Sequence, residues 1–125
     1  ARGSNMGDIE NGQFILPREV IKAACNYFSD MHKSTIKSET FCCGGGGGLL
    51  TDDLIDLRIK GAKPRMHALK QSEQDSGVNT LAAICAICKS QFSKVLPNYD
   101  FDPYMIVSVH QLVSDAIILT KDSDI

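Results

Sequence analysis

The stretch "VNTLAAICAICKSQFSKVL" (residues 78–96) contains the pattern that decides the fold class. Residues 78–84 form an almost continuous apolar run between turn signals, which is typical of a buried parallel strand. The chain then passes directly into residues 85–96, whose pattern predicts a short helix that ends at Pro97. A strand that leads into a helix is the building unit of α/β proteins.

The flanking sequence extends this alternation of strands and helices. Downstream, residues 104–109 ("YMIVSV") predict a second buried strand, and residues 110–119 predict a final helix. Upstream, the sequence predicts a short strand over residues 38–43 and helices over residues 17–31, 50–60 and 64–76. Gly61 is expected to stop one of these helices and Pro64 to begin the next. We therefore expect a single α/β domain with a mainly parallel sheet flanked by helices.

Composition and charge exclude several classes of protein. At 125 residues and 43% hydrophobic residues, the chain can bury one ordinary core. A net charge of -2 gives no sign of the excess positive charge that binds nucleic acid or an anionic membrane. The apolar stretches are too short or too polar to span a bilayer, and no signal peptide opens the chain. Five cysteines, an odd count, argue against a secreted disulfide framework and for a reducing, cytoplasmic location.

Two pairs of cysteines occupy corresponding places in this scheme. Cys42 and Cys43 end the strand predicted upstream, and Cys85 and Cys88 follow the strand at residues 78–84. In an open α/β sheet, ligands bind outside the carboxyl ends of the strands. Both pairs are therefore expected to face one crevice.

Five glycines directly follow the first cysteine pair. Without side chains, Gly44, Gly45 and Gly46 let the backbone approach a bulky object, and their N–H groups can point at negative charge. An iron–sulfur cluster held by thiolates is bulky and anionic, and hydrogen bonds to its sulfurs tune its potential. The thiols and the glycine run together favour such a cluster.

Three other kinds of site use similar residues. A Cys-x-x-Cys at a helix start is also a dithiol motif, whose exchange chemistry would leave a disulfide between Cys85 and Cys88. Four cysteines can hold a structural zinc ion, although the side chains of adjacent Cys42 and Cys43 diverge. A phosphate-binding loop is the third, but the glycine run lacks the Lys-Ser/Thr end of a P-loop and the spacing of a dinucleotide fingerprint. The residues alone leave these alternatives open.

Longer stretches carry a family resemblance: "FCCGGGGGLLTDDLIDLRIKGAKPRMHAL" (41–69), "AAICAICKSQFSKVLP" (82–97) and "IVSVHQLVSDAI" (106–117). They resemble the cysteine-rich CCG domain of heterodisulfide-reductase-type iron–sulfur proteins, and most of all its DsrK-like members. The resemblance covers most of the chain, residues 17–119. A double cysteine with glycines, followed by a Cys-x-x-Cys, is a highly specific pattern.

The resemblance implies a function and a set of ligands. By position, Cys42, Cys43, Cys85 and Cys88 match the last four cysteines of the family motif and would bind a non-cubane [4Fe–4S] cluster. The cluster would reduce or oxidise a disulfide or trisulfide on a small DsrC-like sulfur-carrier protein. The other implied partners are subunits of a membrane-bound electron-transfer complex, which would attach the domain to the membrane. A structural zinc-binding or non-catalytic interaction module is the alternative function.

The chain departs from the family motif at one ligand. The motif has a fifth cysteine well before the double cysteine, and Cys25 lies too close to Cys42 to match it. The opening residues "ARGSNMG" (1–7) are either a cloning scar or native sequence, and we favour native sequence because a small residue and an Arg often follow the family's first cysteine. We therefore expect residues 1–125 to be a CCG domain from the C-terminal part of a larger iron–sulfur subunit, with the first motif cysteine upstream. The metal site of this piece would then be incomplete, and either empty or filled by zinc.

Other residues have a functional and a plain interpretation. His110 follows the strand at residues 104–109 and could donate a proton to a leaving thiolate, or be a helix-start residue without a catalytic role. Arg65 and Lys63 could dock a carboxylate-bearing protein tail, or be ordinary surface cations. Three further residues fit helix core positions: Met66, Phe92 and Leu96.

Overall fold

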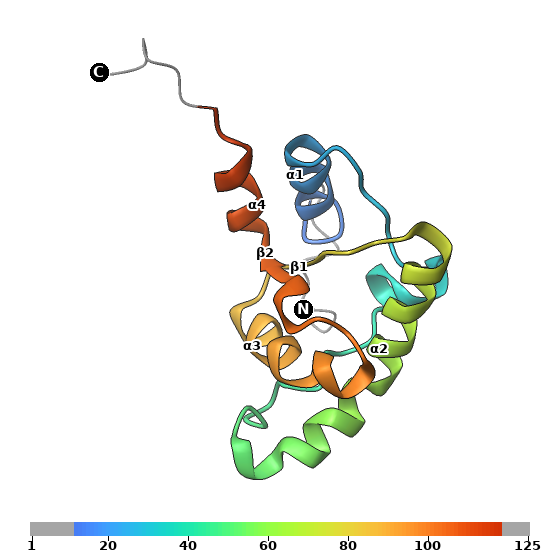
Figure 1. Ribbon diagram of the computed structural model, residues 1–125, viewed down its shortest axis with the longest axis vertical. Helices are drawn as coiled ribbons and strands as arrows, with labels where there is room; N and C mark the ends of the chain where they lie inside the picture. Colours follow the sequence, from blue (N-terminus) through green and yellow to red (C-terminus); the bar gives the residue numbers. More distant parts are fainter. Residues whose placement is uncertain (1–11, 119–125) are drawn as a thin grey trace, which may run out of the picture.

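The computed structural model describes residues 12–118, and the opening segment at residues 1–7 lies outside them. The helices and strands are α1 (Leu16–Ala24), α2 (Ile55–Ser76), β1 (Leu81–Ala83), α3 (Ala86–Val95), β2 (Ile106–Ser108) and α4 (Val109–Ala116). Short 3-10 turns lie between them: η2 (Lys33–Thr35), η3 (Lys37–Glu39), η4 (Asp52–Leu54), η5 (Leu96–Tyr99) and η6 (Pro103–Met105). Figure 1 shows the two strands at the centre, α1 beside α4, and the long α2 along one side.

The strand–helix–strand unit expected around residues 78–109 is present. β1 and β2 pair in parallel, with Leu81 opposite Ile106 and Ala83 opposite Ser108. The expected extent of the sheet is wrong: over residues 12–118 the sheet has two strands, and most of the ordered structure is helical. The α/β class is therefore supported, but a mainly parallel sheet is not.

The strand expected over residues 38–43 does not form. Lys37–Glu39 is a 3-10 turn, and the next residues have no strand partner. The carbonyl oxygen of Phe41 accepts hydrogen bonds from Arg65, and that of Cys43 accepts one from Gln91. Arg65 of α2 and Gln91 of α3 thus donate hydrogen bonds to carbonyl oxygens that would pair with a neighbouring strand in a sheet.

The two helices expected over residues 50–76 are one continuous helix, α2. Gly61 does not stop it, and it lies opposite Gly44: a Cβ atom on Gly61 would be 3.5 Å from the Cα atom of Gly44, an ordinary contact. Pro64 also lies inside the helix. The expected end at Gly77 is confirmed, since this residue adopts the left-handed conformation with φ 65°. Arg58 therefore lies near the start of a helix, where the sequence placed it near an end.

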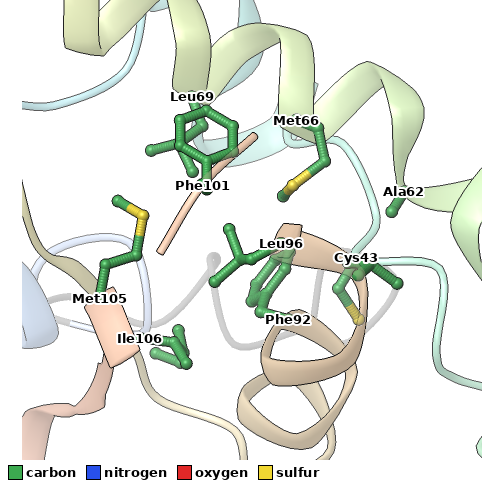
Figure 2. Close-up of a cluster of buried hydrophobic side chains, with 11 residues drawn as sticks. Cys43, Ala62, Met66, Leu69, Phe92, Leu96, Phe101, Met105 and Ile106 are labelled. Carbon is green, nitrogen blue, oxygen red and sulfur yellow. The ribbon is translucent and has the colours of Figure 1, made fainter. Parts of the chain in front are cut away.

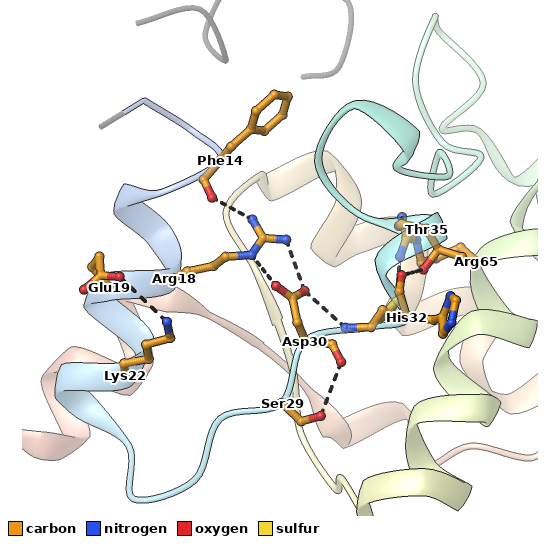
Figure 3. A network of polar contacts seen from close by, with 10 residues as sticks. Phe14, Arg18, Glu19, Lys22, Ser29, Asp30, His32, Thr35 and Arg65 are labelled. Atoms are coloured by element: carbon orange, nitrogen blue, oxygen red, sulfur yellow. Dashed lines mark hydrogen bonds and ion pairs between the residues drawn. The ribbon is translucent and has the colours of Figure 1, made fainter. Parts of the chain in front are cut away.

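α1 is shorter than expected, because it ends at Ala24 with Cys25 as its C-cap. The chain then runs back along α1, and Asp30 accepts hydrogen bonds of 2.5 and 3.1 Å from Arg18 (Figure 3). This half-buried ion pair ties the returning segment to the helix. None of the helices in residues 12–118 is both long and apolar enough to cross a membrane.

One apolar core lies between α2, α3 and the segment around η5 and η6 (Figure 2). The expectation that Met66, Phe92 and Leu96 are core residues is confirmed, with exposed fractions of 1%, 7% and 0%. Cys43 belongs to the same buried cluster. The cysteine pair after residue 41 is therefore anchored to the core of the protein.

The same substitution at two glycines of α2 should have opposite effects on stability. Gly61→Ala should stabilise the chain by up to about 1 kcal/mol, because alanine favours a helix interior and a contact of 3.5 Å is ordinary. Gly77→Ala should destabilise it by about 1 kcal/mol, because φ 65° is strained for alanine. Urea unfolding measures both values. A larger loss for Gly61→Ala than for Gly77→Ala would contradict the continuous helix.

Candidate functional site

The structure brings the two cysteine pairs together. The thiols of Cys43 and Cys88 share a hydrogen bond, Cys42 adjoins Cys43, and Cys85 adjoins Cys88. Cys42 and Cys85 are exposed, Cys88 is half-buried and Cys43 is buried. Four sulfurs thus form one continuous row that runs from the surface to the edge of the core and back.

Local structure positions the second pair. β1 ends at Ala83, and Cys85 then occupies the N-cap position of α3, with φ -119° and ψ 130°. Cys88 follows in the first turn of the helix. The Cys-x-x-Cys therefore opens a helix at the carboxyl end of a strand, as the sequence predicts.

The glycine run has two parts with different roles. At Gly44, which has φ 89°, a Cβ atom would lie 2.9 Å from backbone atoms of Gly61 and Ala62 in α2. At Gly45, a Cβ atom would lie 2.8 Å from the Cβ atom of Gln91 in α3. A Cβ atom on Gly46 would have no neighbour within 4 Å. The close approach expected of the glycines is thus made, at the first two positions, to the protein itself.

The backbone N–H groups of this run point at sulfur. The N–H of Gly44 donates to the Sγ atom of Cys42 at 3.3 Å, and the N–H of Gly45 donates to the Sγ atom of Cys43 at 3.5 Å. Hydrogen bonds to a sulfur stabilise its thiolate form. The amide of Gly45 therefore favours negative charge on Cys43.

Gln91 is a site residue that sequence reasoning missed. Its side chain is fully buried, and its Nε2 atom donates to the carbonyl oxygen of Cys43 at 2.9 Å and to that of Arg58 at 3.1 Å. The Nε atom of Arg58 donates in turn to the Oε1 atom of Gln91 at 2.8 Å. The sequence offered one signal for Gln91: it lies one helical turn after Cys88, which places both residues on the same face of the predicted helix.

The hydrogen bonds between thiols separate their pKa values. The Cys88 thiol donates to Cys43 and, with the N–H of Gly45 and the Cys42 thiol, lowers the pKa of Cys43 to about 6, although burial opposes this. The pKa of Cys88 is raised, because it donates to that thiolate, is buried and lies near the charges of Cys43 and Cys85. Backbone N–H groups at the start of α3, first that of Cys88, lower the pKa of Cys85.

Two other candidates lie apart from the row of sulfurs. His110 is exposed and lies two residues after Ser108, the residue of β2 that pairs with Ala83 of β1. Cys85 lies two residues after Ala83, so His110 and Cys85 occupy corresponding positions beyond the ends of the two paired strands. No hydrogen bond joins His110 to a thiol among the described residues, and its catalytic role stays a prediction. Cys25 is half-buried at the end of α1 and likewise has no bond to the other thiols there.

The donor atoms decide what the site can hold. Across residues 12–118, no group of three or more His, Cys, Asp or Glu side chains is arranged to hold a metal ion. Soft thiolate donors select zinc, copper(I) or iron–sulfur clusters, and amide hydrogen bonds to sulfur are typical of clusters. The four thiols of Cys42, Cys43, Cys85 and Cys88 therefore fit an iron–sulfur cluster by their chemistry.

Alanine at the first glycine should destabilise the chain, whereas alanine at the third should not. Gly44→Ala places a Cβ atom 2.9 Å from the backbone of α2 at a positive φ, so a loss of about 2–4 kcal/mol is expected in urea unfolding. Gly46→Ala is the matched control, with a change within about 0.5 kcal/mol. Equal losses would contradict the separation of the run into a packed and an open part.

The thiol pair should make the stability of the reduced, metal-free chain depend on pH. Because the pKa of Cys43 falls from 9.0 to about 6 on folding, the unfolded chain binds more protons between these values. Stability should rise over this range, on the order of 4 kcal/mol, and be lost again as the pH falls to 6. Above pH 9 the raised pKa of Cys88 acts in the opposite direction.

Anaerobic urea unfolding at several pH values measures this dependence. Cys43→Ser should flatten the rise between pH 6 and pH 9. Cys25→Ser removes a thiol outside the row and should leave the rise in place. An equally steep rise in Cys43→Ser would contradict the assignment of the thiolate.

The chain is similar to part of two archaeal proteins. It is 42% identical over 120 residues to "Hdr-like menaquinol oxidoreductase iron-sulfur subunit 2" of Archaeoglobus fulgidus, and 39% identical over 120 residues to "Hdr-like menaquinol oxidoreductase iron-sulfur subunit" of Archaeoglobus profundus. Each match covers 96% of this chain but 20% of the relative, so the chain spans about a fifth of their length. No protein-family model and no solved structure matches the chain. The similarity extends over almost the whole of this chain, and both relatives are named as iron–sulfur subunits.

Proposed function

We propose that this chain is the cluster-binding CCG domain of an Hdr-like oxidoreductase subunit. Cys42, Cys43, Cys85 and Cys88 would supply thiolate ligands to a [4Fe–4S] cluster of the non-cubane type. The observation that carries the proposal is the continuous row of these four thiols, in a chain similar to iron–sulfur subunits. When bound, the cluster would supply one-electron transfer to and from a sulfur substrate.

The residues around the thiols prepare them as ligands. Metal binding needs deprotonated thiols, and the amide of Gly45 favours the thiolate of Cys43. The buried Gln91 holds the carbonyl of Cys43, so the sulfur is kept beside that of Cys88. The exposed Cys42 and Cys85 leave one side of the row open to a substrate or partner.

The wider reaction follows from the family resemblance and the names of the relatives. The substrate would be a disulfide or trisulfide on a small DsrC-like sulfur-carrier protein, as in DsrK-like subunits of dissimilatory sulfur metabolism. Electrons would be exchanged with the other subunits of a menaquinol-linked complex, through which this cytoplasmic domain would be attached to the membrane. His110 would donate a proton to the leaving thiolate.

Anaerobic reconstitution with iron and sulfide tests cluster binding. Four cysteines are enough to hold a [4Fe–4S] cluster. Against the expectation of an empty or zinc-filled site, the native chain should therefore turn brown, with absorption in the visible range and an electron paramagnetic resonance signal after oxidation or reduction. Cys43→Ser and Cys88→Ser should each lose most of the bound iron, about tenfold or more, because each removes a ligand from the middle of the row. Cys25→Ser is the control and should keep it.

Two other results would contradict cluster binding, and each points to a different function. A colourless chain that takes up no iron, but binds zinc tightly through the same four cysteines, would replace the redox function with a structural zinc module. A chain that forms a disulfide between Cys85 and Cys88 and binds neither metal would point to dithiol exchange.

A further inference from the structure

A buried arginine holds the carbonyl oxygen of Phe41, the residue that directly precedes the first cysteine pair. Arg65, in the middle of α2, is 7% exposed. Its Nε and Nη2 atoms donate to the carbonyl oxygen of Phe41 at 3.2 and 2.9 Å, and Nη2 also donates to that of Thr35 at 3.2 Å. Its Nη1 atom contacts the Sδ atom of Met31. Figure 3 shows Arg65 reaching from α2 to the segment that carries Thr35.

These acceptors are all neutral. In the part of the chain that the structure describes, no carboxylate lies within ion-pair distance of Arg65. Arg18 is different, because Asp30 pairs with it at 2.5 Å. A buried cation without a counter-ion is costly, so its retention needs a negative partner or a structural gain.

Few acidic groups lie near Arg65. Burial lowers the pKa of Arg65, and four acidic groups oppose this: the carboxylate of Asp30, then the thiol groups of Cys42, Cys43 and Cys88. Three of the four belong to the row of sulfurs. Phe41, whose carbonyl the guanidinium holds, directly precedes Cys42 in the chain.

We propose that Arg65 is the counter-charge of the thiol site. Its guanidinium compensates the negative charge of the thiolates and of the anionic group that they hold, and its bonds to Phe41 fix the backbone that presents Cys42 and Cys43. The compensation of a bound anionic group rests on the proposed function, whereas the compensation of the thiolates does not. Arg65 is thus a positioning residue, and its charge makes the site favour anions over neutral molecules.

Two disulfide reagents of different charge measure this preference in the full, reduced, metal-free chain. In each reaction the Cys42 thiolate attacks the reagent's S–S bond, a mixed disulfide forms, and the reagent's other sulfur leaves as a thiolate with the bonding electron pair. One reagent is the dianion 5,5′-dithiobis(2-nitrobenzoate), and the other is the neutral 4,4′-dithiodipyridine. The ratio of the two rates at Cys42, read by peptide mass spectrometry, cancels any change in the fraction of thiolate.

The variants separate charge from geometry. Arg65→Gln should lower the ratio about three- to tenfold, because it removes a positive charge that attracts the dianionic reagent but not the neutral one. Arg65→Lys keeps the charge and should stay within about twofold of the native ratio. Lys22→Gln is the matched control, since it removes a charge that is paired with Glu19 on α1, and it should leave the ratio unchanged.

A second measurement tests the charge on a bound group. In the reconstituted chain, Arg65→Gln should shift the midpoint potential of the cluster to more negative values, because a nearby cation favours the reduced form. Arg65→Lys should restore most of the shift. If Arg65→Gln fails to fold in urea unfolding, Arg65→Met takes its place in both measurements.

The outcomes distinguish this inference from the proposed function. A native ratio in Arg65→Gln, or an equal fall in Arg65→Gln and Arg65→Lys, would overturn the counter-charge. An unchanged midpoint potential in Arg65→Gln would overturn it as well. A fall in the ratio that Arg65→Lys restores, in a chain that takes up no cluster, would support the counter-charge while the proposed function fails.

Discussion

The rest of the site depends on one close crossing of backbone. The chain at Gly44 and Gly45 passes between α2 and α3, so near that a methyl group at either position would lie 2.8 to 2.9 Å from neighbouring atoms. At this crossing Gln91 holds the carbonyl oxygen of Cys43. The crossing brings Cys43, which lies in an irregular loop, beside Cys88 of α3, which is far from it in the sequence.

The crossing also explains how an irregular segment is kept in one conformation. A loop without strand partners must satisfy its backbone polar groups in another way. Here the buried side chains of Arg65 and Gln91 take the carbonyl oxygens of Phe41 and Cys43, and the thiols take two N–H groups of the glycine run. The hydrogen bonds that order the loop are therefore the same ones that fix the charge and position of its sulfurs.

What the sequence could predict was local. The apolar run at residues 78–84 and the turn into the Cys-x-x-Cys predicted a strand followed by a helix, and both formed, although β1 is shorter. The failures involve partners distant in the sequence. Gly61 was expected to stop a helix, but it lies inside α2, and its backbone is what a Cβ atom on Gly44 would meet at 2.9 Å. The strand expected over residues 38–43 is absent because arginine and glutamine side chains compete for its acceptors.

The site residues show the same limit, because sequence patterns reveal local features but not partners that are distant in the sequence. The pattern of cysteines and glycines was sufficient to name Cys42, Cys43, Cys85 and Cys88 as one group, and the structure places them in one row. The buried Gln91 could not be found by composition, because a glutamine one turn after a cysteine is usually a surface residue. Its role depends on which segment packs against α3, and the sequence of α3 does not contain that information.

Native mass spectrometry of the anaerobically reconstituted chain measures the mass of what the four thiols hold. If they ligate a cluster, the native chain should carry an adduct that contains both iron and inorganic sulfide, and Cys43→Ser and Cys88→Ser should lose it. An adduct of a single metal ion without sulfide, or no adduct on the native chain, would contradict cluster binding.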